Sequence, residues 1–212
     1  MRGAIFDFDG TLLDSMWIWD TAVDRRLKEQ GREPAPGLRQ TILRMSLPVA
    51  SAYLKELYHL PQSVDEIVRD TVRFVHADYA NRAEPKPGIP AFLMRLHGAG
   101  VKACIATAGD RTLVEAGLAH CGIAAAFCGI VTCADVGKSK DTPEVYEAAL
   151  RLLGLPKSDV VVFEDAYHAA KTAKNAGFRV VGVYDASEPE QEKLRGIGER
   201  LTADYTDIPT DF

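Results

Sequence analysis

The chain has 212 residues, of which 25 are basic and 30 acidic, so its formal net charge at pH 7 is -5. Hydrophobic residues make up 47% of the sequence and charged residues 26%, a balance typical of a folded globular protein and not of a disordered chain. A mildly acidic chain without a basic block lacks the electrostatic signature of nucleic-acid and anionic-membrane binders, so we expect neither partner.

No pattern in the sequence predicts export or membrane insertion. Asp7 interrupts the N-terminal run too early for a signal peptide, and no apolar run approaches the length of a membrane span. The four cysteines contain no Cys-x-x-Cys pair, which predicts neither a zinc site nor a disulfide framework. We therefore expect a cytoplasmic protein with reduced thiols.

Short apolar runs alternate with helical patterns through most of the chain. The runs predict strands buried on both faces of a sheet, over residues 4–6, 101–106, 160–163 and 180–183. The helical patterns cover residues 112–120, 143–153 and 166–176. Strands that alternate with helices predict an α/β fold, a Rossmann-like parallel sheet flanked by helices.

The segment after the first strand departs from this alternation. Its four successive helical patterns have no strand between them: apolar positions 16, 19, 23 and 27, residues 38–45, residues 49–58, and a stripe from Val64 to Tyr79 that begins with a capping box at Ser63 and Glu66. The two prolines between Glu84 and Gly88 predict a stiff turn that ends the block. We expect a small α-helical domain over residues 15–82, inserted into a core made of residues 1–14 and 83–212.

Polar residues follow several of the predicted strands directly. Asp7 and Asp9 come after the first strand, Thr107 after the second, and Glu164 with Asp165 after the strand over 160–163. Alone, the run that contains Asp7 and Asp9 would suit a polar turn at the end of a buried strand. Carboxyl ends of parallel strands meet at one edge of the sheet, however, so we expect these side chains to converge on one cleft.

The chemistry of these residues fits phosphoryl transfer. Carboxylate oxygens are hard ligands that suit Mg²⁺. A hydroxyl, a backbone N–H and a lysine such as Lys140, in the loop before the helical pattern at Pro143, can bind phosphoryl oxygens. One carboxylate can act as a nucleophile that forms an aspartyl-phosphate, and a second can act as general acid and base.

Four segments of the chain, in order, resemble the four motifs of the haloacid dehalogenase-like hydrolases. The run Asp7-Phe8-Asp9-Gly10-Thr11-Leu12-Leu13-Asp14-Ser15 resembles the first motif, and Ile105-Ala106-Thr107 the second. Lys140 with Pro143 resembles the third, and Phe163-Glu164-Asp165 the fourth. The helical insertion resembles the cap domain of the subgroup that contains β-phosphoglucomutase and phosphoglycolate phosphatase.

The resemblance implies roles for the acidic residues. Asp7 would be the nucleophile and a ligand of Mg²⁺. Asp9 would be the general acid and base, with its backbone carbonyl also on the metal. Asp165 would bind Mg²⁺ directly, and Glu164 would bind it through a coordinated water.

The resemblance also implies a phosphate-binding set. The Thr107 hydroxyl, the Ala108 N–H and the Lys140 amine would hold the phosphoryl oxygens. Lys140 is preferred to Lys138 because its spacing to Pro143 fits the motif better. We therefore expect a phosphoric monoester hydrolase that acts on a small phosphorylated metabolite through an aspartyl-phosphate.

Two other functions stay open. In a sugar-phosphate mutase like β-phosphoglucomutase, a cap histidine would stand where this chain has Trp19, and a cap arginine where the best local alignment places Leu47, with Arg44 nearby. A catalytically idle phosphate-binding module is the other alternative, and the retention of every motif residue argues against it. Trp17 and Trp19 are expected to pack between cap helices more than to contact substrate. The substrate stays open, and a monomer and a dimer are both compatible with the sequence.

Overall fold

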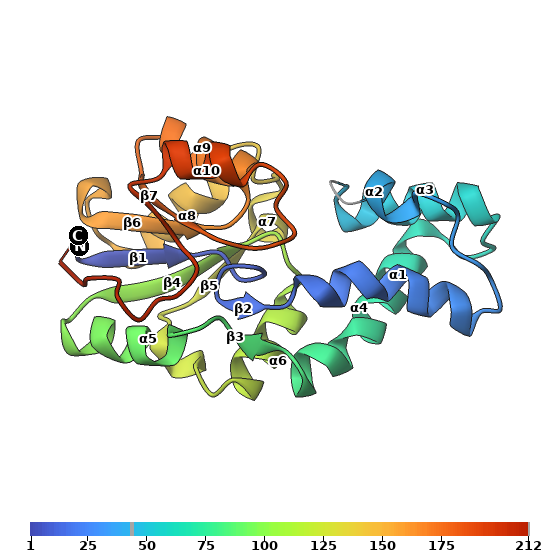
Figure 1. The fold of residues 1–212 in the computed structure, drawn as a ribbon, viewed down its shortest axis with the longest axis horizontal. Coiled ribbons are helices and arrows are strands. Elements are labelled where there is room, and N and C mark those ends of the chain that lie inside the picture. The colour runs from blue at the N-terminus through green and yellow to red at the C-terminus, as the bar shows by residue number, and fades with distance from the viewer. Residues whose placement is uncertain (43–44, 212) are drawn as a thin grey trace.

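The computed structural model describes residues 1–42 and 45–211 of the chain. At its centre is a parallel sheet of six strands in the spatial order β5-β4-β1-β6-β7-β8 (Figure 1). The strands are β1 (Gly3–Phe6), β4 (Lys102–Thr107), β5 (Ile130–Thr132), β6 (Val160–Glu164), β7 (Arg179–Val183) and β8 (Arg200–Thr202). The expected Rossmann-like α/β fold is confirmed. Because the strand order reverses at β1, the carboxyl ends of β1, β4 and β6 frame a crevice of the kind that binds ligands.

Alternate residues of the central strands point to opposite faces of the sheet, and both faces are buried. Phe6 lies in register with Ile105 on one side and Phe163 on the other, and its ring stacks on Phe163 with centroids 4.5 Å apart. Ile5, the preceding residue, belongs to the hydrophobic cluster on the other face. Burial on both faces explains why these strands are continuous apolar runs without a polar alternation.

Helices cover both faces of the sheet (Figure 1). The face that carries Phe6 packs against α5 (Ile89–Gly98) and α6 (Arg111–His120). The opposite face packs against α8 (Glu144–Leu153), α9 (Tyr167–Asn175) and α10 (Gln191–Ile197). The short helix α7 (Cys133–Val136) and the 3-10 turns over Ala124–Ala126 and Lys157–Asp159 complete the connections. Among the described residues, no helix has both the length and the apolar character needed to cross a bilayer.

The helical insertion lies between β2 and β3 and projects away from the sheet (Figure 1). Its helices are α1 (Met16–Glu29), α2 (Leu38–Ile42), α3 (Leu47–Tyr58) and α4 (Val64–Asn81). The capping box predicted at the start of α4 is present: the Ser63 N–H donates to Glu66 Oε2 at 2.7 Å, and the Glu66 N–H donates to Ser63 Oγ at 3.3 Å. Arg44, a candidate substrate contact, lies outside the described residues.

Two short strands, neither of them predicted from the sequence, join the insertion to the rest of the chain. β2 (Leu13–Asp14) pairs antiparallel with β3 (Glu84–Pro85), where only a stiff turn was expected. Two residues are too few to produce an alternating pattern, and proline is tolerated in strands that need no donor. The Lys86 N–H extends this two-stranded β-ribbon of β2 and β3 by donating to the carbonyl of Leu12 at 2.9 Å.

Candidate active site

Asp7 and Lys140 form the centre of the candidate site at the carboxyl ends of the strands. Asp7 follows β1, and its N–H donates to the carbonyl of Phe163 in β6 at 2.9 Å. The Lys140 Nζ lies 2.6 Å from Asp7 Oδ1 and 2.8 Å from Glu164 Oε2. Burial alone would lower the pKa of Lys140, but the two carboxylates outweigh it and raise the pKa above its ordinary value. Lys140 therefore stays charged, whereas Lys138 is exposed to solvent.

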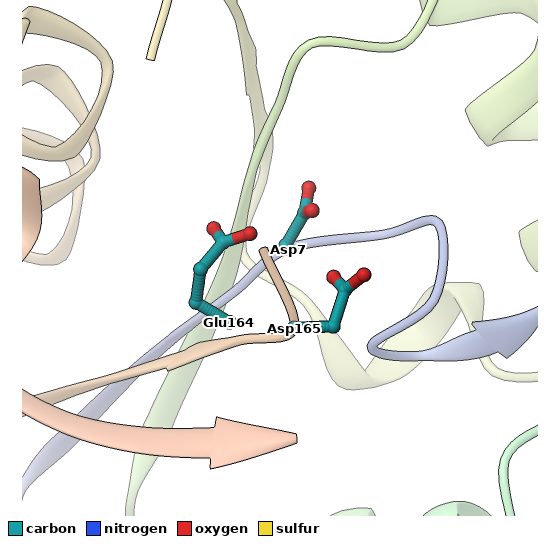
Figure 2. Close-up of side chains that lie close together, drawn as sticks. All are labelled: Asp7, Glu164 and Asp165. Carbon is teal, nitrogen blue, oxygen red and sulfur yellow. The ribbon is translucent and has the colours of Figure 1, made fainter. Parts of the chain in front are cut away.

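Three carboxyl groups crowd together beside this lysine. Oxygens of Asp7, Glu164 and Asp165 lie within 4.8 Å of one another, and Figure 2 shows Asp7 on one chain segment and the other two at the end of β6. Burial, together with the charges of Asp7 and Glu164, raises the pKa of Asp165 well above its ordinary value. Clustered carboxylates in a buried site repel one another, and hard oxygen donors suit a divalent cation. The donor set therefore fits Mg²⁺.

Hydroxyl groups orient two of these carboxylates. The Thr11 hydroxyl donates to Asp165 Oδ1 at 2.8 Å, and the Tyr146 hydroxyl donates to Glu164 Oε2 at 2.9 Å. Gly10, next to Thr11, has a φ of 74°, and a β-carbon there would come within 2.3 Å of Asp165 Oδ2. Glycine at this position permits both the left-handed turn and the close approach of the backbone to the acidic cluster.

Asp9 lies apart from the acidic cluster and has its own hydrogen bonds. Its Oδ1 accepts from the Ser15 hydroxyl at 2.6 Å and from the Tyr79 hydroxyl. Burial raises the pKa of Asp9 to about 6, although these two hydrogen bonds oppose the rise. A carboxyl group with a pKa near 6 can give up and regain a proton near neutral pH, as a general acid and base must.

Thr107 ends β4 beside Asp9. Its hydroxyl oxygen accepts from the Gly109 N–H at 2.9 Å, and the side chain is buried. A β-carbon on Gly109 would lie 3.2 Å from Thr107 Oγ1 and 3.3 Å from Asp9 Oδ2, so both oxygens face the same loop. Ala108, in that loop, is exposed. The fold thus brings together the residues that the sequence analysis selected, on one edge of the sheet: Asp7, Asp9, Thr107, Ala108, Lys140, Glu164 and Asp165.

Several residues that hold these side chains were not predicted from the sequence. Tyr79 and Tyr146 lie on buried helix faces, where a tyrosine is easily taken for core packing. The signal that marks them is the hydroxyl group, which needs a partner when it is buried. Trp19 also takes part, because its indole N–H donates to the Tyr79 hydroxyl at 2.7 Å. Trp17 instead donates to the carbonyl of Asp14, and its ring lies under the Arg82 guanidinium.

Known proteins share this sequence pattern and fold. The chain is 29% identical over 188 residues to a protein of Drosophila melanogaster named "Probable pseudouridine-5'-phosphatase", a match that covers 85% of this chain and 80% of that one. It is 28% identical over 179 residues to a pyrophosphatase, PpaX, of Halalkalibacterium halodurans, with 84% and 81% covered. The crystal structure of CbbY from Rhodobacter sphaeroides in complex with phosphate superposes with a TM-score of 0.84 at 23% identity, covering 98% of this chain and 96% of that one.

The family model for haloacid dehalogenase-like hydrolases matches residues 4–183. The match extends from the first residues of β1 to the end of β7 and includes every residue of the candidate site. The resemblance noted in the four motifs is therefore confirmed, and the chain belongs to the haloacid dehalogenase-like hydrolase family.

Proposed function

We propose that the protein is a phosphatase that hydrolyses a small phosphorylated metabolite through an aspartyl-phosphate on Asp7. The observation that carries the proposal is the pairing of Asp7 with Lys140, at 2.6 Å, beside a second carboxyl group whose pKa is about 6. The nucleophile and the proton donor are therefore separate groups in different surroundings. The names of the fly and bacterial relatives, both phosphatases, agree with this reaction class.

The first half of the proposed reaction transfers the phosphoryl group to the protein. A carboxylate oxygen of Asp7 bonds to phosphorus while the bond from phosphorus to the ester oxygen breaks. Asp9 gives its proton to that ester oxygen, and the alcohol leaves neutral. Lys140, Thr107 and the N–H of Ala108 are proposed to hold the phosphoryl oxygens as negative charge builds on them.

The second half regenerates the protein. Asp9, now a carboxylate, accepts a proton from a water molecule as that water bonds to phosphorus. The bond between phosphorus and Asp7 then breaks, which releases inorganic phosphate and restores both carboxyl groups to their starting states.

We propose that Asp7, Asp165 and the backbone carbonyl of Asp9 hold Mg²⁺, with Glu164 acting through a bound water. When bound, the ion would supply positive charge that offsets the crowded carboxylates and the phosphoryl oxygens.

We also propose that the chain is divided into a catalytic core and a cap domain. Residues 1–14 and 83–212 would carry the chemistry, and residues 15–82 would act as a cap that excludes water and selects the substrate.

The test is phosphate release from a panel that includes pseudouridine 5'-phosphate, pyrophosphate, sugar phosphates and small-acid phosphates. Each substrate is assayed with Mg²⁺ and with EDTA. Metal-dependent release that disappears in Asp7→Asn, together with a phosphorylated Asp7 detected by mass after acid quench, is the expected result. A folded protein that releases no phosphate from any substrate in the presence of Mg²⁺ would overturn the proposal, and transfer between sugar-phosphate positions in its place would identify a mutase.

A further inference from the structure

Asp9 is the end of a hydrogen-bond chain that begins in the helical insertion. The Trp19 indole N–H in α1 donates to the Tyr79 hydroxyl in α4 at 2.7 Å, and the Tyr79 hydroxyl donates to Asp9 Oδ1. Tyr79 is fully buried, and its ring stacks on Phe8 with centroids 6.1 Å apart. The phenol therefore has a fixed position relative to the loop that carries Asp9.

The direction of each hydrogen bond in this series follows from the chemistry of the side chains that form it. An indole N–H can only donate, so the Tyr79 oxygen is the acceptor of the bond from Trp19. A phenol has one proton, and with its oxygen occupied by Trp19 that proton is directed to Asp9. Ser15 donates a second hydrogen bond to the same oxygen of Asp9, at 2.6 Å.

The two oxygens of Asp9 consequently have different surroundings. Oδ1 accepts from both Ser15 and Tyr79, and it cannot carry a transferable proton without losing one of these donors. Oδ2 lies toward the loop at Thr107 and Gly109, where the proposed phosphoryl site is. We infer that Tyr79, oriented by Trp19, is a positioning residue that holds Asp9 so that Oδ2 is the oxygen that exchanges the proton with the leaving group.

The inference rests on the proposed phosphatase function and specifies which groups of the helical insertion support it. During the first half of the reaction the proton moves from Asp9 Oδ2 to the ester oxygen as its bond to phosphorus breaks. During the second half a proton returns from water to the same oxygen. Tyr79 and Trp19 keep their protons throughout, and neither touches the reacting atoms.

The experiment compares two substrates that differ in their need for a proton. p-Nitrophenyl phosphate has a leaving group that is stable as an anion, whereas an alkyl phosphate from the panel that the wild type hydrolyses requires protonation. With the protein in excess over substrate, the rate of alcohol release reports the first half of the reaction alone. Tyr79→Phe should lower this single-turnover rate about tenfold or more on the alkyl phosphate, because hydrogen bonds to charged groups are the stronger kind, and less than about twofold on p-nitrophenyl phosphate. The ratio of the two single-turnover rates does not depend on the folded fraction of the variant.

Trp19→Phe should change the same ratio in the same direction, and the double variant should show no more than the effect of Tyr79→Phe alone, because Trp19 acts through Tyr79. Tyr58→Phe is the matched control. It removes a phenol hydroxyl that, among the described residues, bonds to backbone groups of Ala35 and Glu33 alone, and it should leave the ratio unchanged.

Asp9→Asn separates the inference from the proposed function. If the wild type hydrolyses both substrates and the single-turnover rate of alcohol release by Asp9→Asn falls mainly on the alkyl phosphate, the proposed acid is present. Equal losses on the two substrates in Tyr79→Phe would then overturn the inference alone, as would a double variant in which the two losses add in full. A wild type that hydrolyses neither substrate would overturn both.

Discussion

At the scale of single residues, the candidate site places more negative charge in a buried volume than its own lysine can balance. Lys140 contacts Asp7 and Glu164, while Asp165 accepts from the uncharged hydroxyl of Thr11. Burial and its two acidic neighbours both disfavour the charged form of Asp165. Such an arrangement makes the protein less stable when no cation is present. Sites that bind a ligand commonly lower the stability of the protein in this way.

Asp165→Asn tests this relation. The amide keeps an oxygen that can accept from Thr11 but removes a carboxyl group whose pKa rises on folding, and such a group costs stability at pH values above its ordinary pKa. We therefore expect the variant to be more stable than the wild type in EDTA at pH 7 by about 1–2 kcal/mol. For a chain of this size that gain corresponds to an increase in Tm of about 2–8 °C. Thermal unfolding with EDTA and with Mg²⁺ is the measurement. The wild type should gain stability from Mg²⁺ and the variant should not; a variant less stable than the wild type in EDTA would contradict the account.

The sequence could predict the members of this site but not the groups that hold them. Asp7, Asp9 and Asp165 are recognisable because each directly follows a strand or falls in a short motif, and strand ends converge by geometry alone. Tyr79 and Tyr146 occupy positions of a helical stripe that suit any large side chain. Their partners, Asp9 and Glu164, become neighbours only when the helices pack, which the local sequence does not encode.

At the scale of elements, the contact between α4 and α6 fixes the position of Tyr79. Gly117 of α6 lies against Leu13, Phe8 and Tyr79, at a point where the two helices approach closely. A β-carbon on Gly117 would come within 2.9 Å of both Leu13 Cδ1 and Phe8 Cζ, and within 3.4 Å of Tyr79 Cδ1. These neighbours are fully buried and cannot move without disturbing the core.

Gly117→Ala should therefore destabilise the protein. Alanine in a helix gains about 1 kcal/mol over glycine, but overpacking a filled core costs about 1–3 kcal/mol, and we expect overpacking to exceed the gain. Gly196→Ala is the matched control, because Gly196 is an exposed glycine of α10 and a β-carbon there would have no neighbour within 4 Å among the described residues. Urea unfolding of both variants is the measurement. A Gly117→Ala variant as stable as Gly196→Ala would show that the contact is not tight.

Most of the long elements were predicted from their patterns, whereas the helices α5 and α10 and the short strands were not. The central strands and the helices α6, α8 and α9 were expected within one residue of their observed starts, since burial on both faces and helical periodicity leave clear signals. The strands β2, β3, β5 and β8 have two or three residues each, below the length at which a pattern appears. Pairing with a neighbouring strand, and not local preference, creates them.

At the scale of the whole molecule, the C-terminal half anchors the ribbon that carries the helical insertion. The Tyr205 hydroxyl donates to the carbonyl of Thr11 at 3.0 Å, and the Tyr205 N–H donates to the carbonyl of Pro87 at 2.9 Å. The Lys86 Nζ lies 2.6 Å from Asp185 Oδ2, a partner 99 residues away in the sequence. Both ends of the insertion are therefore tied to the C-terminal half of the chain.

The buried pair of Lys86 and Asp185 gives this anchor a measurable pH dependence. Burial disfavours the charged Asp185, but hydrogen bonds from Lys86 and Ser187 outweigh it and lower the pKa of Asp185 below its ordinary 3.8. A carboxyl group with a lowered folded-state pKa stabilises the protein above its ordinary pKa, and that stabilisation is lost as the pH falls through the folded-state value. Lys86→Met should cost about 3 kcal/mol at pH 7, because it leaves a buried carboxylate without its cation.

The difference in unfolding free energy between the wild type and Lys86→Met should be largest at neutral pH and should shrink below about pH 4, where the wild type also loses the ion pair. Arg2→Met is the control. It breaks an ion pair with Asp159 in which the Arg2 side chain is 70% exposed, and exposed pairs contribute about 1 kcal/mol or less. Denaturant unfolding at several pH values measures both variants. If the difference in unfolding free energy between the wild type and Lys86→Met stays constant down to pH 3, then lost packing, and not the lost charge of Lys86, accounts for the destabilisation.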